Sequence, residues 1–156
     1  MSEEIATETT SEATESKDPV ASLTEDLQRL QAEYSNYKKR VDRDRLLVAD
    51  IATASALTEM LPILDDLDRA SEHGELTGGF KAIADQITNL TQKLGLEKFG
   101  EAQTTFDPNI HEALMHETSA DVKETTVTKI LQFGYKHKER VLRPARVVVT
   151  DPEHGS

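Results

Sequence analysis

The stretch SLTEDLQRLQAEYSNYKKRVDRDRLLVADIATASALTEML, from Ser22 to Leu61, decides the fold. It contains no glycine or proline, so it predicts one helix of roughly 40 residues, about 60 Å long. Apolar side chains recur in it at the alternating four-and-three spacing of paired helices, and only Asp44 interrupts the seam. They are Leu23, Leu27, Leu30, Tyr34, Tyr37, Val41, Val48 and Ile51. A seam this long needs a second helix of similar length, which predicts a parallel homodimer.

Both ends of this helix carry recognisable signals. Ser22 with Glu25 three residues later matches a capping box, which predicts that the helix begins at Ser22. Pro62 cannot donate the helical hydrogen bond and clashes with the preceding turn, so we expect a kink or break there. The interval 22–61 is therefore predicted to be a long helix of the coiled-coil type.

A helical hairpin is predicted for residues 62–95. Helical spacing resumes after Pro62, the glycine-containing stretch 71–79 predicts a loop, and a second amphipathic helix follows. Gly95 then fits the left-handed residue that ends many helices. A hairpin this short cannot bury its apolar faces alone, so two copies are expected to form a four-helix bundle. Its additional interface residues would be Leu64, Leu67, Ile83, Ile87 and Leu90.

Residues 96–151 are predicted to form a small β domain. Asp107 in FDPN, residues 106–109, favours a turn. The intervals 127–133 and 141–150 are rich in β-branched residues and predict strands, with a reversal over 136–139. The fold class is thus mainly α with a small β domain, and residues 152–156 are expected to be a tail.

Charge and composition restrict the function. The chain has 156 residues, no cysteine and a formal net charge of −11, which disfavours nucleic acid and anionic membranes as partners. Residues 1–21 are acidic and weakly hydrophobic, so we expect a disordered tail that either keeps the protein soluble or regulates it. We identify no stretch near the roughly 20 apolar residues needed to span a bilayer. These features predict a soluble, cytoplasmic protein.

Two basic clusters stand out in this acidic chain, at 38–45 and 136–146. The first is either a solvated helix face with pairs such as Arg40 with Asp44 or a contact for an acidic partner. The second holds five bases on one predicted hairpin, of which Arg140 is the best candidate for contact with a partner's carboxylate. Its bases are Lys136, Lys138, Arg140, Arg143 and Arg146.

Catalytic and metal-binding patterns do not emerge from the sequence. His111 and Glu112 resemble the beginning of a zinc motif, but His116 comes one residue too late to share a helix face with His111. The acids Asp65, Asp66 and Asp68 lack loop glycines, so we interpret them as a solvated face. We therefore expect no catalytic residue, no metal, no cofactor and no enzymatic activity.

Three stretches together resemble the GrpE family, the nucleotide exchange factors of DnaK-type chaperones. The first is MLPILDDLDRA, residues 60–70, and the second is FDPNIHEA, residues 106–113. The third is LQFGY, residues 131–135, followed by Arg140 and LRPA, residues 142–145. The resemblance covers roughly residues 22–151.

The resemblance implies a parallel homodimer whose β domain binds the chaperone's ATPase domain and opens its nucleotide cleft. By position in the matching motifs, the residues facing the chaperone would be Phe106, Pro108, Leu131, Arg140, Val149 and Lys38. The family often has a glycine turn before this arginine, whereas this chain has Lys138-Glu139. Because neither residue readily takes a positive φ, we expect a longer loop there.

The predicted function is that of a cochaperone that stimulates ADP release. The main alternative is a dimeric coiled-coil scaffold whose β domain binds another acidic protein surface. An effect on ADP release from a DnaK-type ATPase domain separates these two hypotheses.

Overall fold

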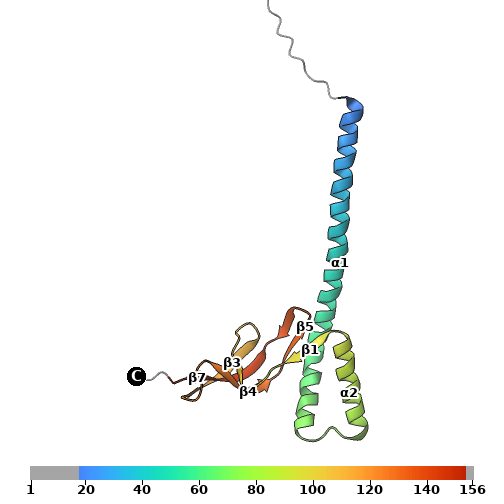
Figure 1. Cartoon of the computed structure of the whole chain (residues 1–156). Helices are drawn as coiled ribbons and strands as arrows, with labels where there is room; N and C mark the ends of the chain where they lie inside the picture. Colours follow the sequence, from blue (N-terminus) through green and yellow to red (C-terminus); the bar gives the residue numbers. More distant parts are fainter. Residues whose placement is uncertain (1–17, 154–156) are drawn as a thin grey trace, which may run out of the picture. The chain divides into compact units, whose positions relative to one another are not determined.

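The computed structural model describes residues 18–153, so most of the predicted acidic tail and the last three residues lie outside the described range. Two helices, α1 (Pro19–Glu72) and α2 (Gly78–Lys93), precede seven strands (Figure 1). The strands are β1 (Leu96–Phe99), β2 (Thr104–Thr105), β3 (His111–Ser119), β4 (Thr126–Gln132), β5 (Gly134–His137), β6 (Arg140–Arg143) and β7 (Ala145–Pro152). The predicted fold class, a long helix, a second helix and a small β domain, is confirmed. The chain divides into two compact units, residues 1–46 and 47–156.

Helix α1 is longer at both ends than the sequence predicted. It begins at Pro19, and the backbone N–H of Val20 donates to Oδ1 of Asp18 at 3.1 Å. Asp18 is therefore the N-cap, with proline at the first helical position, and the predicted capping box at Ser22 is wrong. Pro62 lies inside the helix. The predicted break does not occur, because Leu61 and Leu64 on either side of Pro62 are buried in the same core.

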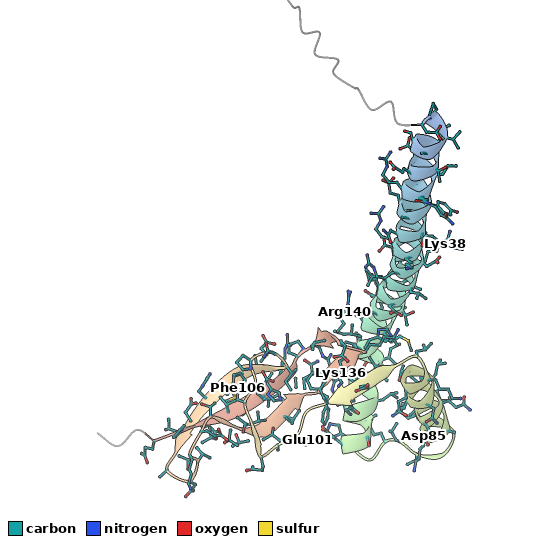
Figure 2. The ribbon with its side chains drawn as sticks, turned by 45° about the horizontal axis from the view of Figure 1, so that its top comes forward. Lys38, Asp85, Glu101, Phe106, Lys136 and Arg140 are labelled. Atoms are coloured by element: carbon teal, nitrogen blue, oxygen red, sulfur yellow. The ribbon has the colours of Figure 1, made fainter. Side chains whose placement is uncertain are left out.

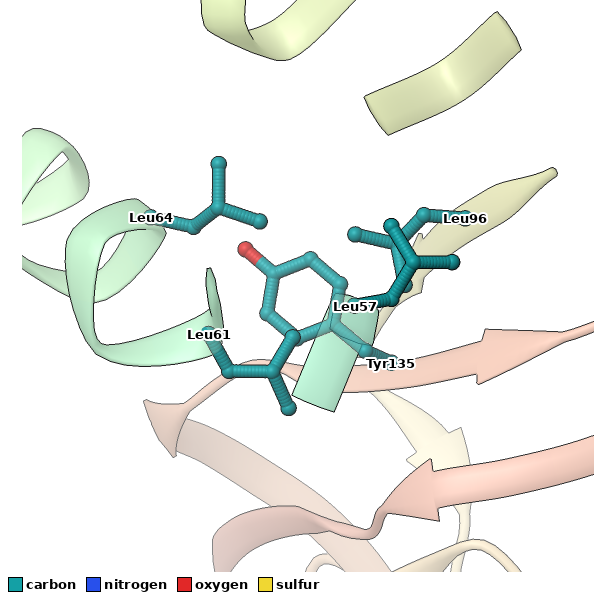
Figure 3. Packing of buried hydrophobic residues seen from close by; sticks show 5 residues of the cluster. All are labelled: Leu57, Leu61, Leu64, Leu96 and Tyr135. Carbon is teal, nitrogen blue, oxygen red and sulfur yellow. The ribbon is translucent and has the colours of Figure 1, made fainter. Parts of the chain in front are cut away.

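That core joins α1 to the β domain (Figure 3). Leu57, Leu61 and Leu64 of α1 pack with Leu96 of β1 and Tyr135 of β5, and Ile87 of α2 lies against them. Burying a leucine side chain contributes about 1.5–3 kcal/mol, so these contacts hold the domain on the helix. Leu64 is buried within one chain, which corrects its expected place in a dimer interface.

The β domain consists of two sheets. Strands β1, β5 and β6 form a three-stranded antiparallel sheet in the order β1-β5-β6. The second sheet has the order β2-β4-β7-β3, in which β3 runs parallel to β7. The core of the four-stranded sheet is made by Val127, Ala145, Val147 and Val149. Strand β4 of the four-stranded sheet ends at Gln132, and β5 of the three-stranded sheet begins at Gly134. Phe133 is therefore the single residue that links these two strands.

The strands differ in detail from the sequence prediction. The predicted strand over 141–150 is split at Pro144, which has no N–H to donate to a ladder. His137 pairs with Arg140, so Lys138 and Glu139 form a two-residue turn. Lys138 takes a φ of +53°, and the longer loop predicted here is therefore wrong. Gly95 has a φ of +88°, which confirms it as the left-handed residue after α2.

One stretch of α1 corrects an expectation about membranes. An 18-residue window of this helix has a mean hydropathy of 1.5 and few charges, so by length and composition it could cross a bilayer. Core helices of soluble proteins meet the same criterion. Ala54, Leu57 and Leu61 are buried against the rest of the chain, whereas only 17% of the window is buried.

Candidate functional site

The β domain is bound to α1 by ion pairs as well as by apolar packing. The strongest joins Asp65 to Arg143, whose Nη1 and Nη2 donate to the two carboxylate oxygens at 2.6 and 2.7 Å. Both side chains are largely buried, with 17% and 18% of their areas exposed. Removing one partner from such a buried pair typically costs about 3–5 kcal/mol. Asp65 is thus a structural anchor, and its predicted place on a solvated face is wrong.

The surroundings of Asp65 favour its charged form. Burial raises the pKa of this carboxyl, but hydrogen bonds from Arg143 and Gln132 outweigh that effect and hold the pKa below its ordinary value of 3.8. The Gln132 amide donates to Oδ2 at 2.9 Å. Asp65 therefore receives donors from both sheets, because Gln132 belongs to β4 and Arg143 to β6.

A second anchor lies one helical turn further along α1. Lys98 of β1 donates to both carboxylate oxygens of Asp68 at 2.7 Å. Its ammonium also lies 3.9 Å from the centre of the Phe133 ring, a distance that gives a cation–π attraction. Asp68, like Asp65, was predicted to face solvent, and the structure corrects this as well.

The turn between β5 and β6 makes the third ionic contact with α1. Nζ of Lys138 lies 2.6 Å from Oδ1 of Asp50. This hydrogen bond and the lysine's charge lower the pKa of Asp50. Because both side chains are well exposed, solvent screens this pair and it contributes little to stability. Its main consequence is to account for one base of the second cluster.

Most of that basic cluster is neutralised within the chain. Besides Lys138 and Arg143, Lys136 pairs with Glu97 at 3.0 Å and Arg146 pairs with Glu112 at 3.0 Å. Arg140 is exposed, and it is the one base of the five without an acidic partner in the part of the chain that the structure describes. Figure 2 shows it with Lys136 at the β5–β6 hairpin. The fold thus explains four of these charges and leaves Arg140 available for another molecule.

The other residues expected to face a partner lie at separate places. Leu131 is on β4 with 44% of its area exposed, and Lys38 is exposed on α1. Val149 is fully buried in the core of the four-stranded sheet. It cannot contact a partner while that sheet is intact, so the expectation for Val149 is wrong. Its side chain instead supports the sheet that carries Leu131.

Phe106 and Pro108 belong to the turn before β3. Figure 2 shows Phe106 on a different part of the β domain from Arg140. The ring of Phe106 stacks on that of His111, with 5.8 Å between the centroids. Both line a cavity of about 780 Å³ whose wall also includes Phe99 and Phe133. Pro108 is exposed beside it. This part of the domain offers a concave apolar surface.

His111 has a structural place in this turn. Its Nδ1 accepts a hydrogen bond from the backbone N–H of Asp107 at 3.0 Å, which requires a neutral ring. Burial lowers the pKa of His111, and the nearby charge of Asp107 opposes this only in part. Across residues 18–153, no group of three or more acidic or histidine side chains is arranged to hold a metal ion. His111 and His116 lie on strand β3. Our comparison with the zinc motif assumed a helix at this point, and that assumption is wrong.

These features define a class of protein: a long helix that holds a small β domain by apolar packing and ion pairs, with an exposed arginine on that domain that has no acidic partner among the described residues. Comparison with known proteins identifies the particular family. The GrpE family model matches residues 2–151, and the chain belongs to the GrpE family.

Named relatives agree with this assignment. Protein GrpE 1 of Streptomyces avermitilis is 57% identical over 133 residues, which are 85% of this chain and 60% of that protein. Protein GrpE of Streptomyces coelicolor is 56% identical, over 85% of this chain and 59% of its own length. Protein GrpE of Corynebacterium glutamicum is 44% identical, over 87% of this chain and 62% of its own length. The chain thus spans about 60% of the length of these relatives.

Sequence reasoning missed the anchors, and its choice of Arg140 as a contact residue stays a prediction. It assigned Asp65 and Asp68 to a solvated face, and it treated Arg143 as one of the five bases of the cluster at 136–146. The available signal was that the first family-like stretch, 60–70, contains the acids, while the third contains Arg143 and ends next to Arg146. Opposite charges in two distant motifs could have indicated a pair.

Proposed function

We propose that this protein is a cochaperone that binds the ATPase domain of a DnaK-type chaperone and stimulates ADP release, acting as a homodimer in the cytosol. Membership of the GrpE family supports the class of partner. The observation that carries the proposal on this chain is the exposed Arg140, since its four neighbouring bases are paired internally. A guanidinium with free donors suits a carboxylate on a partner.

The proposed mechanism is thermodynamic linkage. If the protein binds the open, nucleotide-free ATPase domain more tightly than the closed, ADP-bound one, it must weaken ADP binding by the same factor. Such an activity needs a rigid binding surface and requires no catalytic group. The β domain would supply contacts at Arg140, Leu131, Phe106 and Pro108, while Lys38 of α1 would contact an acidic part of the chaperone.

The exposed seam of α1 supports a dimer. Leu23, Leu27 and Leu30 each leave at least 60% of their area exposed in the single chain. Tyr34, Tyr37, Val48 and Ile51 continue this exposed stripe, and Val41 on it is half-buried. A second α1 helix would bury these residues at about 1.5–3 kcal/mol for each large side chain.

The hairpin of α1 and α2 also has exposed apolar residues that a second chain could cover. Ile83 and Leu90 are about half exposed. A small cavity of about 90 Å³ lies between the two helices and strands β1 and β5, lined in part by Leu64, Leu67 and Thr88. Leu67 and Ile87 pack against the chain's own core, so they contribute to both the chain and the proposed bundle. We propose that a second hairpin covers the exposed face and completes a four-helix bundle.

The test is a stopped-flow measurement of labelled ADP leaving a DnaK-type chaperone, with and without this protein. Faster release that saturates with protein concentration is the expected result. Binding to the chaperone with an unchanged ADP release rate would overturn the proposal and favour the alternative, a dimeric scaffold. Sedimentation equilibrium under the same conditions should give twice the chain mass of 17.3 kDa.

A further inference from the structure

Phe133 is the junction between the two sheets of the β domain, and it is held on two sides. Its carbonyl accepts hydrogen bonds from Nη2 and Nε of Arg143, at 2.7 and 3.2 Å. Its ring lies against the ammonium of Lys98. Gly134 follows directly, and a Cβ there would come within 2.6 Å of the backbone nitrogen of Ala145. The junction is therefore closely packed.

Both bases that hold Phe133 are themselves bound by acids of α1. Arg143 is held by Asp65 and Lys98 by Asp68, each through two short contacts. The residue before the junction, Gln132, also donates to Asp65. Lys98 and Arg143 contact Phe133 directly, and Asp65, Asp68 and Gln132 connect these contacts to the helix. We call Asp65, Asp68, Lys98, Gln132 and Arg143 the junction clamp.

Outside the clamp, the four-stranded sheet stands away from the helix. A groove of about 360 Å³ separates them, lined by Glu72 and Arg69 of α1 and by Leu114 and Leu131 of the sheet. Because the sheet does not pack flat on α1, its direction is set mainly where the junction is held. Leu131 lies two residues before Phe133, so a change at the junction would move it.

We propose that Asp65 and Asp68 are positioning residues for nucleotide exchange: through the junction clamp they fix the direction of the four-stranded sheet on α1. The inference rests on the proposed function. A β domain free to swing would fit the closed ATPase domain nearly as well as the open one. Its differential affinity, and with it the acceleration of ADP release, would fall.

The neighbouring residue provides a matched control. Asp66 has 70% of its side chain exposed and pairs at 2.9 Å with Arg69 of the same helix. Asp66→Asn also removes one carboxylate charge, at the next position in the sequence, but Asp66 makes none of the contacts of the junction clamp. Lys98→Met is the second test variant, because it keeps an unbranched side chain over Phe133 but releases Asp68. Its pair is partly exposed, so this variant is expected to fold even if Asp65→Asn does not.

The first measurement is the distance between two spin labels, placed on cysteines introduced at Glu59 of α1 and Lys129 of β4. Both positions are exposed, and the chain has no other cysteine. Labelled protein is mixed with an excess of unlabelled protein so that only distances within one chain are recorded. Wild type and Asp66→Asn should give one narrow distribution, whereas Asp65→Asn and Lys98→Met should give broader ones.

The second measurement is the plateau rate of stimulated ADP release at saturating protein. Asp65→Asn and Lys98→Met should lower the plateau by at least about threefold while the dimer mass stays unchanged, because the coupling and not only the affinity is weakened. Asp66→Asn should match wild type.

The outcomes separate the two proposals. If wild type does not accelerate ADP release, the proposed function is wrong, and the spin-label distances still decide whether the junction is clamped. If wild type is active and both clamp variants keep its narrow distance and its plateau, the clamp is overturned. A broader distance with an unchanged plateau would overturn the positioning role. If Asp65→Asn does not fold, Lys98→Met decides the matter by the same criteria.

Discussion

Replacing Arg140 with alanine removes a charge that the chain itself does not use. Arg140 follows the two-residue turn and is exposed, and within residues 18–153 it has no ion-pair partner, unlike the other four bases of its cluster. The substitution therefore takes nothing from the fold that the structure shows. We expect an unchanged melting temperature and an unchanged sedimentation mass, so any effect on ADP release would belong to the proposed contact with the chaperone.

The size of the effect follows from the setting of the residue. Truncating one side of a buried interfacial charge pair costs about 2–5 kcal/mol, and much less at a wet rim. Arg140 is at the edge of the β domain, so we expect a value between these two cases, of at least about 1.4 kcal/mol. A loss of about 1.4 kcal/mol corresponds to a tenfold change. Arg140→Ala should slow stimulated ADP release by at least about tenfold.

Lys136→Ala is the matched control, since it removes a base four residues earlier that already pairs with Glu97. It should change the stopped-flow rate much less than Arg140→Ala. The measurement is made at protein concentrations below saturation, where a lost contact is most visible. A wild-type rate for Arg140→Ala would refute the assigned contact, and equal losses in both variants would show that the cluster acts only through its total charge.

Four further results are expected. Leu30→Asp with Tyr34→Asp should shift sedimentation equilibrium toward the monomer, since both residues lie on the exposed seam; an unchanged dimer would contradict the seam. On heating, the helical signal of the long helix should be lost before the β-sheet signal, and a single calorimetric transition would contradict this order. Gly134→Ala should lower stability by about 1–3 kcal/mol in urea unfolding, because its Cβ would meet backbone, whereas Gly79→Ala has open space and should not. Burial lowers the pKa of His111, so the unfolded chain binds its proton more readily and stability should fall as the pH drops below about 6.5; His111→Phe should weaken that dependence.

The main elements of the fold could be predicted because their signals are local. Heptad spacing, the glycine-containing loop at 71–79 and Gly95 each indicate a structure within a few residues. The helix start was misjudged because two capping signals compete. Asp18-Pro19 pairs an N-cap acid with a proline that is tolerated at the first position, and it lies one turn ahead of Ser22.

Long-range contacts account for the remaining errors. The turn at Lys138 looked unfavourable for a positive φ, yet both sides of it are paired strands and its ammonium binds Asp50, 88 residues away. Pro62 looked like a break, but the cost of a proline in a helix, about 3 kcal/mol, is offset by burial of the leucines around it. Neither compensation is visible in the neighbouring sequence.

A second stripe on α1 places two of the acids that bind the β domain, Asp50 and Asp68. Where the heptad seam ends at Ile51, another four-and-three series begins on the adjacent face: Asp50, Ala54, Leu57, Leu61, Leu64 and Asp68. Its four apolar members are buried against the chain, while its two acids bind Lys138 and Lys98 of the β domain. Eighteen residues are about five helical turns, so the two acids lie on the same face at opposite ends of the apolar segment. The β domain matches this stripe, because its apolar residues Leu96 and Tyr135 pack on the leucines and its bases Lys138 and Lys98 bind the two acids. The two ion pairs therefore fix the position of the β domain along the helix. The heptad seam that precedes it stays exposed in the single chain, so the proposed dimer would use a different part of the same helix.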